Sequence, residues 1–475
     1  MKKLFFILLA TVLLLSGCRQ ETTVELPPPP SSDWHLPSGI TYGELEQTID
    51  SLVEKHQDTM AGLAISVFTR DHVLLEKYYG YANIEEGLAV DADTVFEWAS
   101  ITKTMVWVSA MQLYEQGKLD LNADIRTYLP EDFFAKKLYD EPITMLHLMN
   151  HTAGWTSNTL GRSLFVEYGQ KVYDLEQELR LADPIQNLPP GMNQDYSNYG
   201  VALAGYVVEC ISGIPFYEYV HSNIFEPLGM NHTALKPDLS DNEWVSIQRD
   251  KLKCYAFYDS MLDMGSQRYQ NPIYPAGMST GVVADMRRYG QALLPDANGV
   301  SPLFAKAATM AEMYTSTYPA ESYDENCHGF WKYPFENTVI GHFGGSLGCS
   351  SCLLIDIDGG IGIAVMTNTS NPSITGDMIM EIISGEMEQP QEYYDASAEL
   401  MESGIKITWT PEDETTGYWI WRTIYNGQIG WQLNDNPTMG GEYIDETADP
   451  DTTYYYTIVK TGSDPSKGVK AKYQK

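Results

Sequence analysis

The sequence predicts an α+β protein, in which an antiparallel sheet flanked by helices carries a helical subdomain and is followed by a small all-β sandwich. Three observations predict this class. Strand-like runs stand at both ends of residues 42–388, and the long middle of that region has mostly helical patterns. From about residue 389 onward the runs alternate in period two, with no helical pattern between them. The chain of 475 residues, 43% of them hydrophobic, is long enough for a sizeable core.

The N-terminus has the pattern of a secretory signal. Two lysines precede residues 4–15, which are apolar except for Thr11 and too few to span a bilayer as a helix. A serine and a glycine then stand directly before Cys18, and this run resembles a bacterial lipoprotein box. The resemblance implies that residues 1–17 are removed and that Cys18 is lipidated. The alternative is ordinary signal cleavage with an incidental cysteine.

Residues 18–41 are expected to hold the lipid anchor and a spacer. Four consecutive prolines at 27–30 predict a stiff segment of polyproline type. Such a segment keeps a globular body away from the membrane. The predicted location is therefore the cell membrane, with the protein lipid-anchored and facing the extracellular or periplasmic side.

The charge balance excludes one class of function. The chain has 30 Lys and Arg residues against 64 Asp and Glu residues, which gives a net charge of −34. A charge of that sign repels phosphate backbones and anionic lipid surfaces. Nucleic acid is therefore excluded as a main partner, and membrane contact is expected only through the N-terminal lipid.

The remaining cysteines do not indicate a disulfide framework or a metal site. Five follow Cys18, and an odd number cannot all pair within the chain. Cys349 and Cys352 have metal-ligand spacing, but they lie in a predicted strand, where residues three apart point to opposite faces. We expect buried thiols, with no metal and no other cofactor.

Helix and strand signals divide residues 42–388 into elements. An opening helix is predicted at 42–56 and a closing helix at 374–387. Strands are predicted at 63–68, 73–79, 338–343, 349–356 and 361–368. Asp358 and Gly359, between the last two strands, are typical of a hairpin turn. Strands from both ends of the region are expected to form one sheet.

Residues 389–475 are predicted to form the β-sandwich. Period-two alternation covers 405–409, 418–421 and 453–459, with turn residues between the runs. The strand that ends at Trp409 and the tyrosine-rich third run resemble those of fibronectin type III modules. That resemblance implies a role in spacing or attachment. The alternative is that the tyrosines form a glycan-binding surface, although strand tyrosines are more often packed against neighbouring strands.

Ser100 and Lys103 form the first candidate site. They open a segment, 100–116, whose apolar residues cover nearly every face, which is typical of a buried helix. Three residues apart on a helix, the two side chains share one face. Burial disfavours the ammonium form and lowers the pKa of the amine, so Lys103 is predicted to act as a base toward Ser100. The alternative is a helix-capping serine beside a lysine that extends into solvent.

Tyr196 and Asn198 form the second candidate site. They lie between a Pro-Pro-Gly turn and an apolar, helix-like run at 199–211. One residue apart on a loop or extended segment, both side chains can point the same way. A tyrosine beside an amine can transfer protons, and an asparagine amide can hold a substrate carbonyl. The alternative is a loop tyrosine packed on the core.

His342, Gly344 and Gly345 form the third candidate site, late in a predicted strand. Glycines at such a position let a substrate backbone approach closely. The N–H of Gly345 can pair with that of Ser100 to stabilise an oxyanion. The alternative is a histidine that only packs in the strand.

The three sites together resemble a known family. Their motifs, in this order and spacing, are Ser100-x-x-Lys103, Tyr196-x-Asn198 and His342-x-Gly344. They resemble those of the serine β-lactamase-like hydrolases, above all class C β-lactamases, D-alanyl-D-alanine carboxypeptidases, D-aminopeptidases and esterases. The resemblance covers about residues 42–388.

The resemblance implies a role for each residue. Ser100 attacks an acyl carbonyl, while Lys103 and Tyr196 take and return the proton. The N–H groups of Ser100 and Gly345 stabilise the oxyanion, and water then hydrolyses the acyl-enzyme without a metal. The substrate-binding residues that the resemblance implies are Asn198, His342, Gly344 and Gly345.

The third motif departs from that of penicillin-recognising members, which usually carry Lys-Thr-Gly to bind a substrate carboxylate. Phe343 cannot donate a hydrogen bond, and His342 is mostly neutral at pH 7. We therefore expect a lipid-anchored serine hydrolase acting on D-amino-acid peptides or amides, peptidoglycan-derived ones included, or on small acyl esters. The alternatives are a non-catalytic cell-wall or peptide-binding lipoprotein and a true β-lactamase.

His147 and His151 stand four residues apart, as two metal ligands on a helix do. The residue after His147 is not the glutamate that such a metal helix needs. The run from His151, His-Thr-Ala-Gly, also matches a structural turn of the family. We expect a structural role for both histidines.

Overall fold

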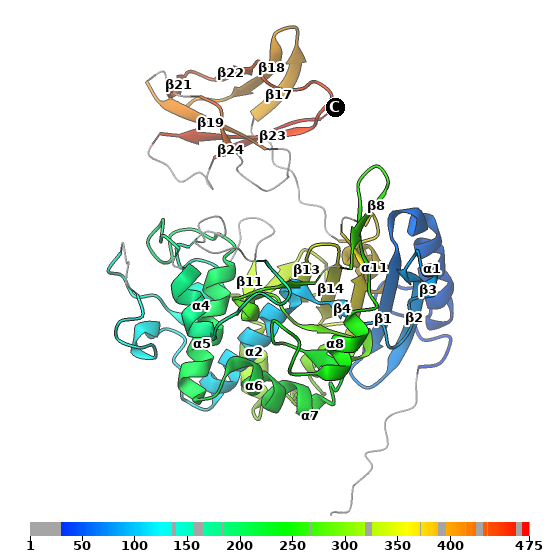
Figure 1. Cartoon of the computed structure of the whole chain (residues 1–475). Coiled ribbons are helices and arrows are strands. Elements are labelled where there is room, and N and C mark those ends of the chain that lie inside the picture. Colours follow the sequence, from blue (N-terminus) through cyan, green and yellow to red (C-terminus); the bar gives the residue numbers. More distant parts are fainter. Residues whose placement is uncertain are drawn as a thin grey trace, which may run out of the picture.

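The structure is a computed structural model of the chain, shown in Figure 1. It describes residues 30–134, 139–155, 165–182, 184–266, 268–318, 325–370, 372–387, 396–413, 415–423, 431–434, 436–461 and 468–474. The expected signal peptide at 1–17, the lipidation site Cys18 and most of the spacer lie outside the described residues. So does the expected boundary between residues 388 and 389.

An eight-stranded antiparallel sheet forms the centre of the first region, in the order β11-β12-β13-β14-β15-β1-β2-β3. Its strands are β1 (Gly62–Thr69), β2 (Val73–Asn83), β3 (Leu88–Ala89), β11 (Asn326–Cys327), β12 (Phe330–Tyr333), β13 (Val339–Gly345), β14 (Ser350–Asp356) and β15 (Ile361–Thr367). Strand β1 pairs with β15, so the two ends of the region close one sheet, as predicted. The expected hairpin joins β14 to β15.

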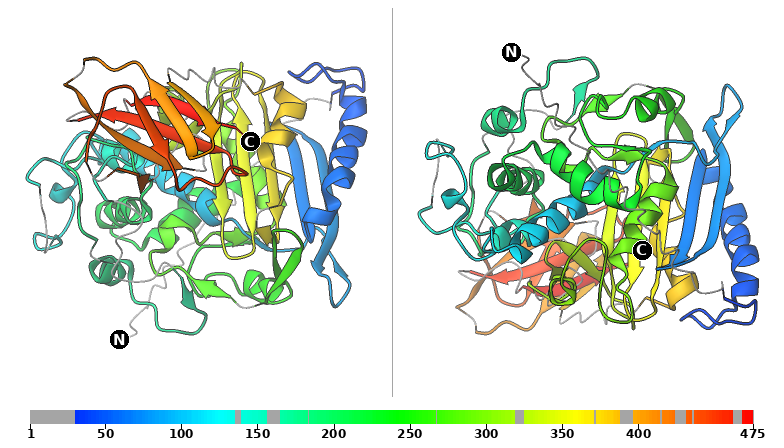
Figure 2. Two further views of the ribbon diagram at one scale, coloured as in Figure 1. Left: turned by 90° about the horizontal axis from the view of Figure 1, so that it is seen from above. Right: turned by 90° about the horizontal axis from the view of Figure 1, so that it is seen from below.

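Helices pack on both faces of this sheet (Figure 2). The helices of this first region are α1 (Tyr42–His56), α2 (Thr102–Glu115), α3 (Met145–Met149), α4 (Leu175–Ala182), α5 (Asn198–Ser212), α6 (Phe216–Val220), α7 (Glu226–Leu228), α8 (Glu243–Arg249), α9 (Val283–Leu293), α10 (Ala307–Met313) and α11 (Gly376–Ser384). Helices α1 and α11 lie on one face of the sheet and α9 on the other. Shorter helical turns are η1 (Gln57–Thr59), η2 (Ala99–Ile101), η3 (Ile125–Thr127), η4 (His221–Phe225) and η5 (Tyr274–Ala276).

Alternation along the strands separates two cores, because successive strand residues point to opposite faces. On β1, Leu63 and Ile65 pack in a cluster with α1 and α11. Ala64 and Phe68 point the other way, into a larger cluster that contains residues of α2, α5 and α9. Helix α2 is buried on nearly all sides within this larger cluster, which is why its lysine cannot reach solvent.

The middle region contains short strands that the helical patterns did not predict. They form three small sheets, β4 (Phe96–Glu97) with β10 (Thr280–Gly281) and β6 (Thr233–Ala234), β16 (Thr369–Ser370) with β7 (Cys254–Phe257) and β8 (Met261–Gly265), and β5 (Val166–Glu167) with β9 (Tyr269–Gln270). Except for β7 and β8, these strands have only two residues and so no period to detect, because only the pairing partner defines them.

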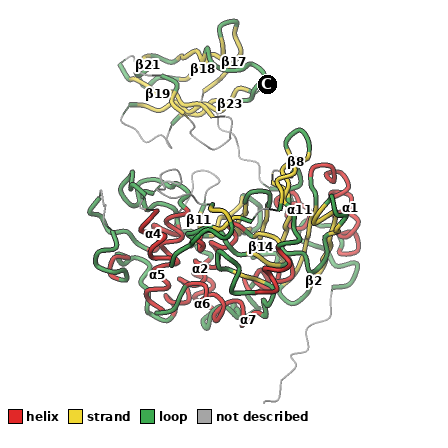
Figure 3. Tube along the Cα trace, viewed as in Figure 1, coloured by secondary structure: helices red, strands yellow, loops and turns green. Residues whose placement is uncertain are grey.

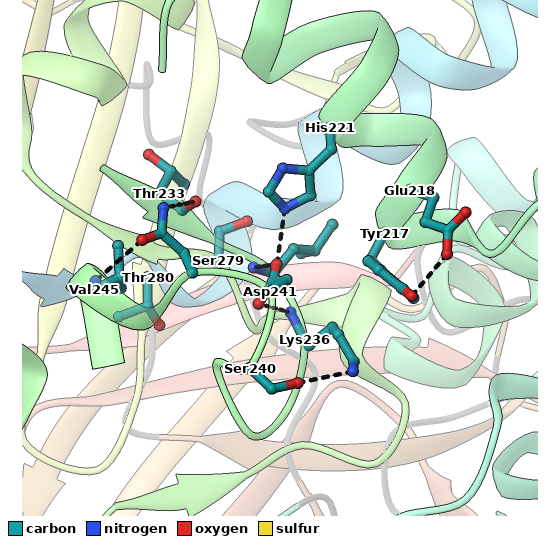
Figure 4. A network of polar contacts seen from close by, with 12 residues as sticks. Tyr217, Glu218, His221, Thr233, Lys236, Ser240, Asp241, Val245, Ser279 and Thr280 are labelled. Carbon is teal, nitrogen blue, oxygen red and sulfur yellow. Dashed lines mark hydrogen bonds and ion pairs between the residues drawn. The ribbon is translucent and has the colours of Figure 1, made fainter. Parts of the chain in front are cut away.

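A polar network holds β6 and the loop that follows it (Figure 4). The Asp241 carboxylate accepts hydrogen bonds from the backbone N–H groups of Leu235 and Lys236 and contacts His221 Nε2 at 2.8 Å. Because β6 pairs with β10, this network also supports the segment that leads from η5 into β10.

The C-terminal residues form two small antiparallel sheets, as predicted (Figure 3). One contains β17 (Ala396–Met401), β18 (Gly404–Trp409) and β22 (Glu442–Asp445), and the other β19 (Gly417–Thr423), β20 (Trp431–Gln432), β21 (Thr438–Met439), β23 (Tyr454–Lys460) and β24 (Val469–Tyr473). Tyr454 and Tyr456 are buried in the core of this region. The resemblance to a fibronectin type III module stays a prediction.

All five cysteines that the structure describes carry free thiols, and four of them are buried. Within the described ranges, no group of three or more His, Cys, Asp or Glu side chains is arranged to hold a metal ion. Among the same residues, no single helix is long and apolar enough to cross a membrane, although Asn198–Ser212 and Phe216–Leu228 meet that criterion as a pair bent by 77°.

Candidate active site

Ser100 lies in the turn η2, directly before α2, rather than at the first residue of the α-helix itself. Its neighbour Ala99 has a φ of 47°, a conformation that residues with a Cβ rarely adopt. The Thr102 hydroxyl fixes this turn, because it donates to the Ala99 carbonyl at 2.6 Å and accepts from the Ser279 N–H at 2.9 Å. The serine is thus held on a rigid turn at the edge of the larger core.

Lys103 reaches Ser100 from inside that core. The lysine is fully buried, and its Nζ lies 2.9 Å from Ser100 Oγ. The Ala276 carbonyl, from η5, accepts a second hydrogen bond from the same Nζ. Burial lowers the pKa of Lys103 to about 7, because an ammonium in an apolar core loses its hydration. The free amine of Lys103 is therefore accessible at neutral pH.

Tyr196 approaches Ser100 from a loop before α5. Its hydroxyl donates to Ser100 Oγ at 3.0 Å, and its ring centroid lies 4.9 Å from Lys103 Nζ. Burial raises the pKa of the Tyr196 phenol, so this group keeps its proton. The structure therefore brings together three of the four side chains that the first two motifs predicted, with Ser100 Oγ between an amine and a phenol.

Asn198 is the first residue of α5, and Ser197 caps that helix through a bond from the Gly200 N–H to Ser197 Oγ. The sequence placed Tyr196 and Asn198 on one loop or extended segment, but the chain turns into a helix between them. The Asn198 side chain is partly exposed.

The third motif lies on β13, whose end packs against the turn that carries Ser100. A Cβ at Gly344 would lie 2.3 Å from the Trp98 carbonyl oxygen and 3.2 Å from the Ser100 nitrogen. A Cβ at Gly345 would meet no atom within 4 Å. Glycine at 344 is therefore required for the close approach of two backbones, and Gly345 borders open space.

His342 is buried on the same strand, with its ring centroid 6.1 Å from that of Tyr196. Burial, and then the nearby Lys103, lower its pKa to about 3, so the imidazole is neutral at pH 7. Phe343 packs against Tyr333 at 5.4 Å, in the cluster that includes α1 and α11. The motif thus presents no charged side chain.

A buried ion pair beside the site was not predicted. Glu97 accepts two bonds from the Arg249 guanidinium, at 2.6 and 3.1 Å, and Arg249 is 1% exposed. The other Glu97 oxygen accepts from the Ser346 hydroxyl at 2.7 Å. These residues stand more than 90 positions apart in the chain, and no local pattern connects them.

A small pocket adjoins these residues. It is lined by Glu97, Phe165, Tyr269, Asn271, Gly277, Met278, Thr280, Ser346 and Leu347. Gly277 follows the carbonyl that binds Lys103, and Ser346 follows Gly345, so the pocket borders the candidate catalytic residues. Its lining is mostly apolar, with one carboxylate and no lysine or arginine.

Known proteins support the fold. A profile of the family described as Beta-lactamase matches residues 45–382. Protein flp of Staphylococcus aureus (strain N315) is 25% identical over 193 residues, which are 40% of this chain and 38% of the relative. The chain therefore matches well under half the length of that relative.

Two solved structures have the same fold. EstCE1, a hydrolase with promiscuous acyltransferase activity, aligns with a TM-score of 0.60 and 19% identity over 73% of this chain and 99% of its own. The D-amino acid amidase from Ochrobactrum anthropi SV3, in complex with D-phenylalanine, aligns with a TM-score of 0.57 and 20% identity over 68% of this chain and 92% of its own.

Proposed function

Because the chain belongs to the beta-lactamase family, we propose that it is a serine hydrolase that forms an acyl-enzyme at Ser100 from D-amino-acid amides or peptides, or from small acyl esters. One observation carries this proposal. The Ser100 hydroxyl lies within hydrogen-bond distance of both a neutralisable amine and a protonated phenol, at 2.9 and 3.0 Å. That arrangement activates a serine as a nucleophile.

The pKa directions of Lys103 and Tyr196 support a proposed order of proton transfers. Lys103, with a pKa of about 7, takes the Ser100 proton while the serine attacks the acyl carbonyl. Tyr196, whose pKa is raised, donates its proton to the leaving nitrogen or oxygen. The lysine then returns the proton to the tyrosine. Water then attacks the acyl-enzyme with the same series of proton transfers, which releases the acid and restores the Ser100 hydroxyl.

The backbone at the third motif completes the proposed site. The N–H groups of Ser100 and Gly345 are the proposed donors to the oxyanion. The absence of a side chain at Gly344 supports this role, because it allows β13 to lie against the serine backbone. Asn198 is proposed to position the acyl side chain.

The charges around the site favour substrates without a carboxylate next to the scissile bond. His342 is neutral, Phe343 is apolar, and no cationic side chain lines the pocket. A penicillin or a D-alanyl-D-alanine terminus would place its carboxylate beside uncharged groups and beside Glu97, which is already paired with Arg249. An amide or a neutral ester has no such cost, and the fold is shared with a D-amino acid amidase and with EstCE1.

Covalent labelling tests the nucleophile. The intact mass of the protein is measured after exposure to a fluorophosphonate, beside the Ser100→Ala variant. One adduct on the parent and none on the variant is the expected result. An unmodified parent that is folded would refute the proposal and favour a non-catalytic, peptide-binding role.

A substrate panel tests the specificity. The panel contains D-phenylalanine amide, L-phenylalanine amide, p-nitrophenyl butyrate and nitrocefin. The D-amide or the ester is expected to be cleaved faster than nitrocefin. Nitrocefin as the best substrate would identify a true β-lactamase and overturn the argument from charge.

We also propose that the protein is exported and anchored through a lipid on Cys18, as the N-terminal pattern indicates. A Cys18→Ser variant is then expected to leave the membrane fraction, while the parent stays in it. Equal membrane association of the two proteins would remove this proposal and leave the hydrolase proposal intact.

A further inference from the structure

His151 has an unusual backbone and a buried side chain. It follows α3 with a φ of 57°, in the left-handed region, and is 2% exposed. A residue with a Cβ takes this conformation only where its surroundings hold it there. The contacts of His151 show what those surroundings are.

Two hydrogen bonds connect His151 to the residues on either side of Tyr196. The backbone N–H of Asp195 donates to the His151 carbonyl at 2.8 Å. The backbone N–H of Ser197 lies 3.2 Å from His151 Nδ1. Because an N–H donates, Nδ1 is the acceptor, and the neutral ring carries its proton on Nε2. One residue therefore fixes the chain both before and after Tyr196.

The imidazole also fixes the plane of the tyrosine. Its ring centroid lies 4.6 Å from that of Tyr196, and Trp331 stacks on it at 5.7 Å with an interplanar angle of 12°. Trp107, from α2, contacts it edge-on at 6.4 Å. The imidazole is therefore held by ring contacts with two tryptophans as well as with Tyr196. Burial and the nearby Lys103 keep the pKa of His151 well below its usual value, so the ring adds no second cation to the site.

We propose that His151 is a positioning residue, which holds the Tyr196 hydroxyl at Ser100 through the acceptor atom Nδ1. The proposal rests on the proposed function, in which Tyr196 handles the proton, and it adds a residue that touches neither substrate nor reacting atoms. His151 acts through the hydrogen bonds on either side of Tyr196 rather than through its own titration.

Two variants separate the effect of the hydrogen-bond acceptor at position 151 from the effect of the positive φ at that position. Glycine and asparagine both tolerate a positive φ, but only asparagine offers an oxygen near the position of Nδ1. We expect His151→Gly to slow the reaction of Ser100 with a fluorophosphonate by about tenfold or more, the scale of a lost buried hydrogen bond. His151→Asn is expected to slow it by less than about threefold. Equal losses in the two variants would overturn the proposal.

A double-mutant cycle shows whether His151 acts through Tyr196. In a Tyr196→Phe background, His151→Gly should cause no further loss. If the losses of acylation rate from the two substitutions multiply in full, His151 has a general structural role and the proposal is overturned. A Tyr196→Phe variant that is as reactive as the parent would overturn the proposal too.

Hydrogen exchange tests the placement of the loop without a measurement of activity. The backbone amide of residue 197 should exchange faster in His151→Gly than in His151→Asn. The amide of residue 195 is the internal control, because it donates to a backbone carbonyl that both variants keep. A parent that forms no adduct but shows this difference would refute the proposed function and leave the placement of the loop. Unchanged exchange in His151→Gly would refute the placement itself.

Discussion

Replacing Lys103 with methionine should abolish the reactivity of Ser100 and yet stabilise the protein at neutral pH. The lysine is fully buried, and burial lowers its pKa from 10.5 to about 7. The unfolded chain keeps the ammonium, so folding in this pH range requires the loss of a proton. Methionine has a similar length, fills the same space and carries no charge.

The magnitude follows from that pKa difference. Each pH unit below 10.5 costs the folded parent about 1.4 kcal/mol, down to the folded pKa of about 7. The cost is about 5 kcal/mol at pH 7 and about 2 kcal/mol at pH 9. Methionine removes this cost, but it leaves the Ala276 carbonyl without its donor, a loss of roughly 1–3 kcal/mol that does not depend on pH. The net stabilisation expected at pH 7 is roughly 2–4 kcal/mol.

The sign of the pH dependence is the decisive feature. The unfolded parent binds more protons than the folded parent between pH 7 and 10, so the parent gains stability as the pH rises. The advantage of Lys103→Met should therefore shrink by about 1.4 kcal/mol per pH unit across this range. Other titrating groups are common to both proteins and cancel in the difference.

Urea denaturation of both proteins at pH 7, 8 and 9 measures this slope. Lys55→Met, at an exposed position on α1, is the matched control, and its difference from the parent should stay constant with pH. A Lys103→Met difference that is independent of pH would refute the reasoning, because it would mean that the buried lysine keeps its proton in the folded protein.

Three further predictions concern the same site. The acylation rate of the parent should rise with pH and level off above about 7, since only the free amine of Lys103 can accept the serine proton, and a rate that is flat between pH 5.5 and 8.5 would contradict this. Gly344→Ala should lower the melting temperature, at a cost of roughly 1–3 kcal/mol, because its Cβ would lie 2.3 Å from a carbonyl oxygen, whereas Gly345→Ala should leave the melting temperature unchanged. Glu97→Gln should destabilise the protein by roughly 3–5 kcal/mol, because it leaves the buried Arg249 unpaired. Glu46→Gln is the control and should cost under about 1 kcal/mol in the same denaturation assay, because Glu46 is exposed and Lys77 keeps Asp50 as a partner.

The predictable part of the fold consists of elements with a long and regular pattern. The helix predicted at 42–56 has those bounds in the structure, and the strands predicted at 349–356 and 361–368 appear as β14 and β15 within one residue at each end. The helix buries Leu45, Ile49 and Val53 at helical spacing, whereas β14 and β15 are continuous buried runs joined by a hairpin turn, so local sequence is sufficient in both cases. The closing helix is shorter than predicted and spans Gly376–Ser384.

The candidate site was predictable to different degrees. Ser100 and Lys103 are three residues apart, so the helix geometry alone places them together. Tyr196 and the third motif lie far along the chain, and only the resemblance to a family connected them to Ser100. The Ala276 carbonyl, the Glu97–Arg249 pair and the two bonds of His151 carried no signal, because backbone acceptors and long-range pairs do not depend on a local pattern.

The sequence by itself therefore determined the α+β class, the two-ended sheet, the C-terminal strands and the identity of the candidate nucleophile and base. The class, the sheet and the strands follow from periodicity, and the nucleophile and base follow from their short spacing together with the resemblance of the three motifs to a family. Only the tertiary structure decided the protonation of the site. The pKa values of Lys103, Tyr196 and His342 depend on how completely their surroundings exclude water. That exclusion arises when α2, the loop before α5 and β13 pack together, and none of these segments produces it alone.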